Sequence, residues 1–209
     1  MIKILVADDH AILRRGIKQI ISDTLDMTVA AEASNGQEVM QQLAKNCFDV
    51  VLLDISMPGK SGLDVIKEIR ILKPALPVLI LSMYPEDQYA IRLLKSGASG
   101  YLTKESAPSE LVKAIRKVAR GGKYVSSTLA EKIAHYFGDS SKEALHESLS
   151  NREYQVMLMI ASGLTPTEIA QKLFLSVKTI STFRSRILDK MNMKNNSELT
   201  HYVISNKLI

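Results

Sequence analysis

Val50-Val51-Leu52-Leu53-Asp54 is the stretch that decides the fold of the first part of this chain. Four consecutive apolar residues, two of them β-branched, are typical of a strand buried on both faces of a parallel sheet. The run ends on a carboxylate, and residues 55–59 then turn the chain. Open α/β sheets bind ligands at the carboxyl ends of their strands, which makes Asp54 a candidate functional residue. Because Asp also favours turns, this segment alone leaves a purely structural role open.

Strand and helix patterns alternate around this stretch. Short apolar runs over residues 2–7, 28–33, 78–81 and 101–102 predict four further strands. Helical spacing of apolar residues follows each strand, over residues 11–22, 39–43, 61–72, 91–97 and 108–120. Repeated βα units of this kind predict a five-stranded parallel sheet with helices on both faces, over residues 1–120.

Composition sets limits on the class of protein. With 209 residues, 46% hydrophobic and 23% charged, the chain suits one large or two small globular domains. No apolar run approaches the length of a membrane span, and charged residues interrupt any signal-peptide pattern, so we expect a cytoplasmic protein without membrane insertion. Cys47 is the only cysteine, which excludes an intrachain disulfide. Its place beside Phe48, just before the buried strand, predicts a packed apolar role rather than a reactive thiol.

The last third of the chain is basic and helical. Residues 148–209 carry eight Lys/Arg against four Asp/Glu, within a net charge of +5 for the whole chain. Such a module suggests contact with a polyanion. Two capping boxes, Ser150–Glu153 and Thr165–Glu168, open helices, and Ser176 caps another that runs to about Met191.

The helix that opens at Thr165 and the helix capped by Ser176 are joined by a tight turn at Phe174-Leu175. This arrangement predicts a helix-turn-helix within a small all-α domain over residues 148–209. The alternative is an ordinary helical bundle. Residues 121–147 are predicted to be a linker with one short helix, of about one and a half turns, that carries Leu129, Ile133 and Phe137.

Polar side chains stand at the ends of four predicted strands: Asp8 with Asp9, Asp54, Ser82 and Lys104. Since the carboxyl ends of parallel strands face one edge, these side chains should converge. Clustered carboxylates repel each other unless a cation joins them, and oxygen ligands favour Mg²⁺. Asp54 is then a candidate nucleophile toward phosphorus, with Lys104 neutralising phosphoryl oxygens. Singly, each residue also has a plainer role: helix capping for the Asp pair, a turn for Ser82, a surface position for Lys104.

Together these residues, with Met57-Pro58-Gly59, Gly62 and Gly100-Tyr101-Leu102-Thr103-Lys104, resemble the receiver domain of two-component response regulators over residues 1–120. The resemblance implies a flavodoxin-like fold, with Asp54 as phosphoacceptor from a sensor histidine kinase. It also implies Mg²⁺ held by Asp9, Asp54 and the Ser56 backbone carbonyl, with Asp8 acting through water. Ser82 and Tyr101 match the switch pair of the family, in which the hydroxyl moves toward phosphate and the ring turns inward.

The helix after Ser176 is the candidate DNA-reading element. Its spacing places Ile180, Phe183, Ile187 and Met191 on a core face. The residues predicted to contact double-stranded DNA are Lys178, Thr179, Ser181, Thr182, Arg184, Ser185 and Arg186, because Lys and Arg pair with guanine or phosphate and hydroxyls add hydrogen bonds. On a lone helix the same residues would form only a solvated face.

This segment also resembles a known domain. Leu149-Ser150-Asn151-Arg152-Glu153, Glu168-Ile169-Ala170, Lys178-Thr179-Ile180 and Lys190-Met191 are similar to the LuxR-type DNA-binding domain of NarL/FixJ-class response regulators. Glu198-Leu199-Thr200-His201 is similar to the GacA/UvrY branch of that class. Many members have Lys at Ser181 and His at Phe183, so base preference does not carry over.

The interpretation is a transcription regulator rather than an enzyme. Phosphate on Asp54 is expected to favour a homodimer whose two DNA-binding domains engage paired half-sites. A haloacid-dehalogenase-like phosphatase also uses a strand-end Asp and Mg²⁺, but such enzymes usually have a second Asp where this chain has Ser56. A receiver that works as an unphosphorylated dimerisation scaffold is a third hypothesis.

Overall fold

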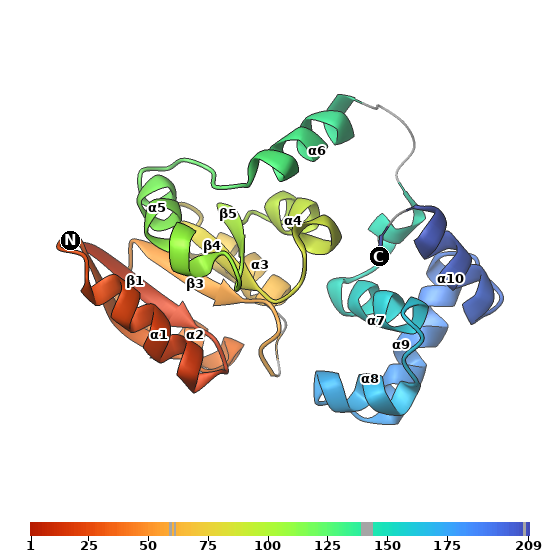
Figure 1. The fold of residues 1–209 in the computed structure, drawn as a ribbon. Helices are drawn as coiled ribbons and strands as arrows, with labels where there is room; N and C mark the ends of the chain where they lie inside the picture. Colours follow the sequence, from red (N-terminus) through yellow and green to blue (C-terminus); the bar gives the residue numbers. More distant parts are fainter. Residues whose placement is uncertain (59, 61, 139–143, 207) are drawn as a thin grey trace. The chain divides into compact units, whose positions relative to one another are not determined.

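The structure is a computed structural model that describes residues 1–58, 60, 62–138, 144–206 and 208–209 (Figure 1). The chain divides into two compact units, Met1–Gly138 and Asp139–Ile209. None of the helices in these described ranges is both long enough and apolar enough to cross a membrane.

The first unit is built on a five-stranded parallel sheet in the order β2-β1-β3-β4-β5. Its strands are β1 (Ile2–Ala7), β2 (Met27–Ala33), β3 (Val50–Asp54), β4 (Val78–Ser82) and β5 (Gly100–Thr103). The helices that connect and follow them are α1 (Ala11–Ser22), α2 (Gly36–Lys45), α3 (Gly62–Leu72), α4 (Glu86–Lys95) and α5 (Ala107–Ala119). The predicted flavodoxin-like receiver fold is confirmed.

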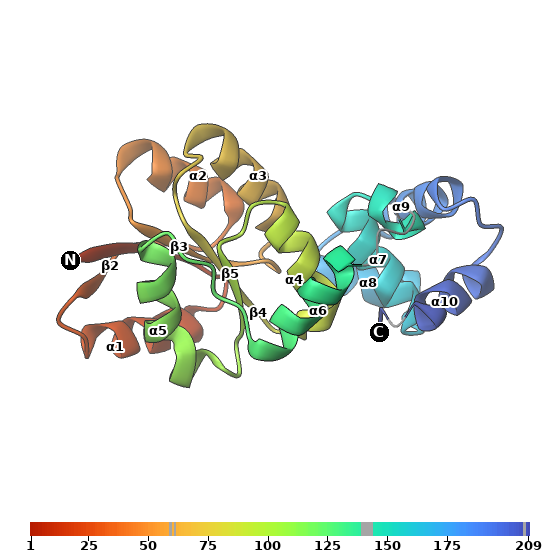
Figure 2. The ribbon, with the colours of Figure 1, turned by 90° about the horizontal axis from the view of Figure 1, so that it is seen from above.

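Strand periodicity divides the core between the two faces of the sheet. Ile4 and Val6 of β1 and Leu52 of β3 pack with apolar residues of α1 and α5 on one face. The residues between them, such as Leu5 and Leu53, are equally buried and point to the other face. Figure 2 shows α1 and α5 on one side of the sheet and α2 and α3 on the other. All five residues of β3 are buried, as expected of a central parallel strand.

Gly62, the first residue of α3, lies against the end of β3. A Cβ atom there would stand 2.5 Å from Ile55 Cα and 2.8 Å from the Asp54 carbonyl oxygen, both backbone atoms that cannot move aside. We expect Gly62→Ala to lower the free energy of unfolding by about 1–3 kcal/mol, the usual cost of overpacking. Urea denaturation monitored by circular dichroism measures this change in the free energy of unfolding.

Gly16 is a matched control for that substitution. It lies inside α1, and a Cβ there would have no atom within 4 Å. Gly16→Ala is therefore expected to raise the free energy of unfolding by about 0.5–1 kcal/mol, because alanine restricts the unfolded chain and favours helix. Equal effects of the two substitutions would contradict the packing argument.

The segment after α5 packs on the same unit. Tyr124 pairs with Gly100 beside β5, and its backbone donates to the Ser99 carbonyl oxygen at 2.9 Å. Helix α6 (Ser127–Gly138) then packs against α4, with Leu129 buried. The expectation of one and a half helical turns is wrong, since α6 has 12 residues. The predicted linker boundaries, 121–147, stay a prediction.

The second unit is helical throughout its described part, apart from connecting turns. It contains a short 3-10 helix, η1 (Leu145–Ser148), followed by α7 (Asn151–Ala161), α8 (Pro166–Leu173), α9 (Val177–Lys190) and α10 (Asn196–Ser205). Both predicted capping boxes are present, and Ser176 caps α9. Phe174, in the left-handed conformation (φ 54°), ends α8 and makes the tight turn into α9. The predicted helix-turn-helix is confirmed.

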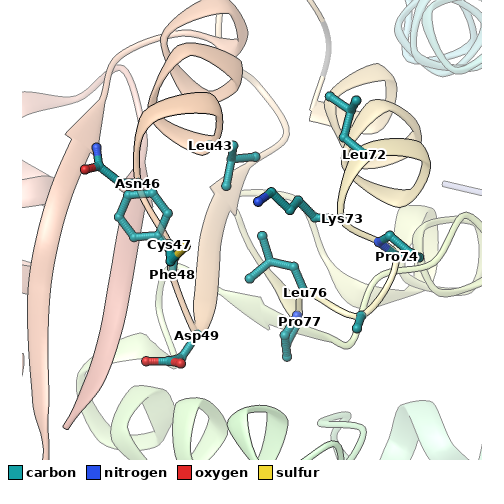
Figure 3. A pocket seen from close by; sticks show the side chains of 11 residues that line it. Leu43, Asn46, Cys47, Phe48, Asp49, Leu72, Lys73, Pro74, Leu76 and Pro77 are labelled. Atoms are coloured by element: carbon teal, nitrogen blue, oxygen red, sulfur yellow. The ribbon is translucent and has the colours of Figure 1, made fainter.

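A hollow of about 480 Å³ lies at the amino ends of β3 and β4, away from the carboxyl edge of the sheet. Figure 3 shows Leu43, Cys47, Phe48 and Leu76 among the side chains that line it. Cys47 is exposed, so the prediction of a packed cysteine is wrong. The reason is that Cys47 belongs to the loop between α2 and β3, and the chain enters the sheet only at Val50.

Candidate metal centre and candidate nucleic-acid interface

Four adjacent strand ends form the polar cluster of the first unit. Asp54 and Ser82 are the last residues of β3 and β4, while Asp8 follows β1 and Lys104 follows β5. Asp8, Asp54 and Ser82 are almost completely buried. Parallel strands in neighbouring positions end at the same edge, which is why residues up to 96 positions apart in sequence meet here.

Lys104 is the centre of this cluster. Its Nζ lies 2.7 Å from Asp8 Oδ2 and 2.8 Å from Asp54 Oδ2, and only 6% of its side chain is exposed. The plain reading of Lys104 as a surface lysine is therefore wrong. The ammonium group lies between two carboxylates from different strands and offsets their mutual repulsion.

Asp9 and His10 complete the cluster on the β1 side. His10 Nδ1 lies 3.0 Å from Asp8 Oδ1 and 2.9 Å from Asp9 Oδ1. His10 occupies the N-cap position of α1, and its side chain makes no capping hydrogen bond. Asp8 Oδ1 accepts from the His10 backbone N–H at 2.8 Å, but both aspartates also contact the cluster, so the Asp pair does not serve only as a helix cap.

These residues fit a hard divalent cation. One ligand atom from each of Asp8, Asp9, His10 and Asp54 lies within 4.8 Å of the others. Asp8 Oδ2 and Asp9 Oδ1 are buried, and neither accepts a well-formed hydrogen bond from a described residue. The nearby nitrogens are Lys104 Nζ, 2.7 Å from Asp8 Oδ2, and His10 Nδ1, 2.9 Å from Asp9 Oδ1. Buried carboxylate oxygens without hydrogen bonds are costly unless a cation coordinates them. Carboxylate oxygens are also the ligands that Mg²⁺ prefers.

Asp54 is held at a high energy in its ionised form. Burial raises its pKa above the ordinary value, and the nearby Lys104 ammonium only partly offsets this. Burial would by itself lower the pKa of Lys104, but Asp54 and Asp8 hold that pKa above its ordinary value. Asp54 is therefore less favourable as an ionised group than an exposed carboxylate, a property that is typical of functional sites.

Ser56, Ser82 and Tyr101 lie around Asp54. The Ser56 backbone N–H donates to Asp54 Oδ1 at 2.9 Å. Ser82 Oγ accepts from the Tyr84 backbone N–H at 3.0 Å, and the Tyr101 hydroxyl donates to the Tyr84 carbonyl oxygen at 2.7 Å. The Tyr101 ring is completely buried. Ser82 and Tyr101 thus share one backbone partner, Tyr84.

In the second unit, α9 presents the predicted DNA-contacting face. Ile180 and Ile187 are buried, and Phe183, expected on the same core face, is only half-buried. The predicted contact residues that are exposed are Lys178, Ser181, Thr182, Ser185 and Arg186. They follow one face of the helix at intervals of three and four residues, opposite the core.

Four predicted contact residues are already engaged within the unit. The Ser181 and Thr182 hydroxyls donate to the backbone carbonyl oxygens of Val177 and Lys178, at 3.1 and 3.0 Å. Arg184 is half-buried, and its Nε donates to Asn196 Oδ1 at 2.7 Å. The Thr179 hydroxyl shares a hydrogen bond with Ser176 Oγ at the cap of α9. Their side chains are therefore less available than those of Lys178 and Arg186.

Three residues near these sites were not predicted to take part in binding. His10 joins the acidic cluster, and only its position directly after two aspartates signalled it. Phe174 and Val177 are apolar yet 73% and 44% exposed at the amino end of α9. Exposure of this kind follows from the tight turn and cannot be read from hydrophobic periodicity.

Comparison with known families decides the identity. Residues 4–116 match the family described as "Response regulator receiver domain". Residues 147–203 match "Bacterial regulatory proteins, luxR family". The chain belongs to the response regulators. It is of the NarL/FixJ class, with a receiver domain and a LuxR-type DNA-binding domain, and this class regulates transcription.

Relatives of similar architecture span the full length of this response regulator. The response regulator UvrY of Escherichia coli K12 is 38% identical over 209 residues, covering 100% of this chain and 96% of UvrY. The oxygen regulatory protein NreC of Staphylococcus epidermidis is 38% identical, covering 99% of each chain. Among solved structures, RcsB of Salmonella enterica serovar Typhimurium, bound to promoter rprA with the phosphomimetic BeF3⁻, is 29% identical. It has a TM-score of 0.64 over 98% of this chain and 100% of that one.

Proposed function

We propose that Asp54 accepts a phosphoryl group from a sensor histidine kinase in the cytoplasm, and that this controls DNA binding by the second unit. The observation that supports it most is the Lys104 ammonium, 2.7–2.8 Å from carboxylates of both Asp8 and Asp54. A cation fixed at this point can neutralise an oxygen of the transferred phosphoryl group. One Asp54 oxygen attacks phosphorus, the bond to the phosphohistidine nitrogen breaks, and an aspartyl phosphate forms.

The proposed metal ligands are Asp9, Asp54 and the Ser56 backbone carbonyl, with Asp8 acting through water. Bound Mg²⁺ would supply positive charge to the reacting oxygens. The residues of the chain do the rest: Lys104 holds Asp54 in place, and the Ser56 N–H orients its carboxylate. The burial of Asp8 and Asp54 strengthens the electrostatic interactions of these carboxylates.

Ser82 and Tyr101 are proposed as the switch. Both contact the backbone of Tyr84, through the Ser82 hydroxyl and the Tyr101 hydroxyl. If Ser82 turns its hydroxyl toward a phosphoryl oxygen, it gives up the bond from the Tyr84 N–H, and the β4–α4 loop must shift. We propose that this rearrangement favours a homodimer.

The proposed DNA-contacting residues of α9 are Lys178, Thr179, Ser181, Thr182, Arg184, Ser185 and Arg186. The exposed basic pair, Lys178 and Arg186, supplies the strongest contacts to phosphate or guanine. Exposed Val177 and Phe174 add apolar surface at the amino end of α9, where thymine methyl groups could be contacted. A dimer would place two such helices on paired half-sites.

One experiment tests both halves of this proposal. Double-stranded DNA is selected from a random pool by the full chain, with and without Mg²⁺ and beryllofluoride, and the affinity for the selected site is measured in both conditions. Beryllofluoride should increase the affinity and the dimer fraction together. Affinity that is indifferent to beryllofluoride would instead indicate an unphosphorylated dimerisation scaffold, and the absence of any selected site would contradict the DNA-binding role.

Loss of the exposed basic residues of α9 should weaken DNA binding. We expect Lys178→Ala and Arg186→Ala each to reduce the affinity for the selected site by about 1–3 kcal/mol, with a lower salt dependence. Lys194→Ala, which removes the same charge from an exposed position after α9, is the control and should change affinity far less. Fluorescence anisotropy over a salt series measures all three, and labelling of Asp54 should be unchanged in each.

A further inference from the structure

The turn between β1 and α1 carries Asp8 and Asp9 of the polar cluster. One side chain from α1 fixes this turn. Arg14 Nη1 donates to the Asp8 carbonyl oxygen at 2.6 Å. The remaining groups of Asp8 are also engaged: its backbone N–H donates to the Ala33 carbonyl at 3.1 Å, and its Oδ1 accepts from the His10 N–H at 2.8 Å. Arg14 is thus the side chain that holds the peptide group joining Asp8 to Asp9.

Arg14 is itself held from the neighbouring strand. Its Nε donates to Glu32 Oε2 of β2 at 3.0 Å, and its side chain is only 18% exposed. Glu32 also accepts from Lys18, one helical turn further along α1. A guanidinium group fits this position because its planar fork can donate in two directions at once, to a carbonyl and to a carboxylate.

We propose that Arg14 is a positioning residue for the divalent cation, an inference that rests on the proposed phosphoacceptor function. By fixing the Asp8–Asp9 peptide, Arg14 sets the direction in which the Asp9 carboxylate leaves the backbone. Asp9 Oδ1 is one of the buried oxygens that accept no hydrogen bond from the described residues. Its direction therefore depends on the backbone that carries it, apart from its contact with His10.

Two physical effects of Arg14 on the cation have opposite signs. As a positive charge near the cluster it repels Mg²⁺, although Glu32 compensates that charge at 3.0 Å. As a clamp on the backbone it preorganises the ligands, and loss of such outer-shell partners typically weakens metal binding about 10–100-fold. Removing Arg14 would tighten Mg²⁺ binding if repulsion dominated, and weaken it if positioning dominates. The sign of the change in Mg²⁺ affinity on removal of Arg14 therefore shows which of the two effects is larger.

The test compares Arg14→Met with Lys18→Met in the full chain. Both substitutions remove a positive charge that pairs with Glu32, but only Arg14 contacts Asp8. Mg²⁺ affinity is measured by the rise in melting temperature with MgCl₂ and no phosphate donor, and separately by the Mg²⁺ concentration that gives half-maximal labelling by acetyl phosphate. We expect Arg14→Met to weaken affinity about 10–100-fold in both measurements, with the rate at saturating Mg²⁺ little changed. Arg14→Lys should recover part of the affinity.

Unchanged or tighter Mg²⁺ binding in Arg14→Met would overturn the proposal. An equal loss in Lys18→Met would also overturn it, because the effect would then belong to the charge of Glu32 rather than to the clamp on Asp8. Failure of the proposed function looks different: the unsubstituted chain would then neither respond to Mg²⁺ nor become labelled. Labelling of the unsubstituted chain with no difference in Arg14→Met refutes the positioning role alone.

Discussion

Asp54→Asn is expected to abolish labelling by acetyl phosphate while leaving the receiver fold intact. The variant lacks the attacking oxygen, so the loss should be complete rather than graded. The local structure can survive: the Asn side-chain oxygen can still accept from the Ser56 N–H, and Lys104 keeps its contact with Asp8 at 2.7 Å. Radiolabelled acetyl phosphate with Mg²⁺, followed by denaturing electrophoresis, measures it.

The same variant is expected to be more stable at neutral pH. Burial raises the pKa of Asp54, so the folded chain binds this proton more tightly than the unfolded chain. The stability that the proton contributes is fully present below the unfolded pKa and is lost as pH rises through the folded one. At neutral pH the ionised carboxylate therefore costs stability, and Asn should raise the melting temperature in the absence of Mg²⁺.

Asp49→Asn is the matched control for Asp54→Asn. Asp49 precedes the same strand, β3, at its opposite end, where it accepts from the Lys3 backbone N–H at 2.7 Å. This variant should be labelled like the unsubstituted chain and should gain no stability. Labelling retained in Asp54→Asn would remove Asp54 from the phosphoacceptor role. A lower melting temperature of Asp54→Asn without Mg²⁺ would contradict the charge argument.

Glu153→Ala is expected to cause a large loss of stability in the DNA-binding unit. One carboxylate oxygen, Glu153 Oε2, accepts from the Ser150 backbone N–H and from Lys190 Nζ, each at 2.7 Å. The side chain is 3% exposed, so it ties the start of α7 to the end of α9 in a buried setting. We expect a loss of about 2–4 kcal/mol, combining a helix cap with a buried charged hydrogen bond. Hydrogen exchange of α7 and α9 measures it.

Glu168→Ala is the control that distinguishes the contribution of the ion pair of Glu153 with Lys190 from that of the helix cap. Glu168 closes the second capping box, on Thr165, but it is exposed, and its short hydrogen bonds are to Thr165 rather than to a lysine from another helix. Its loss of stability should be much smaller than that of Glu153→Ala. Comparable losses would contradict the argument that the buried contact with Lys190 joins α7 to α9.

The contribution of Glu153 to the free energy of unfolding should also depend on pH. Burial opposes ionisation, but Lys190 and the Ser150 N–H hold the pKa of Glu153 below its ordinary value. Its stabilisation is therefore present above the unfolded pKa and lost as pH falls through the folded one. The difference in stability between the unsubstituted chain and Glu153→Ala should accordingly shrink as the pH falls below about 4.

The sequence alone predicted the parts of this protein that are governed by local periodicity and by strand ends. The apolar run into Asp54 and the alternating βα pattern predicted the parallel sheet, and the carboxyl-edge rule brought Asp8, Asp54, Ser82 and Lys104 together. Capping boxes predicted where α7 and α8 begin, because the Ser/Thr and Glu of each box bond within four residues of sequence.

Contacts between distant segments were decided by the tertiary structure. Arg14 with Asp8 and Glu32, and Glu153 with Lys190, depend on how elements pack, which no local pattern specifies. The packing of Tyr124 beside Gly100 is another such contact, and the exposure of Cys47 was likewise decided only by the tertiary structure. Periodicity fixes which face of an element is buried, but the partner across that face is chosen only when the whole chain has folded.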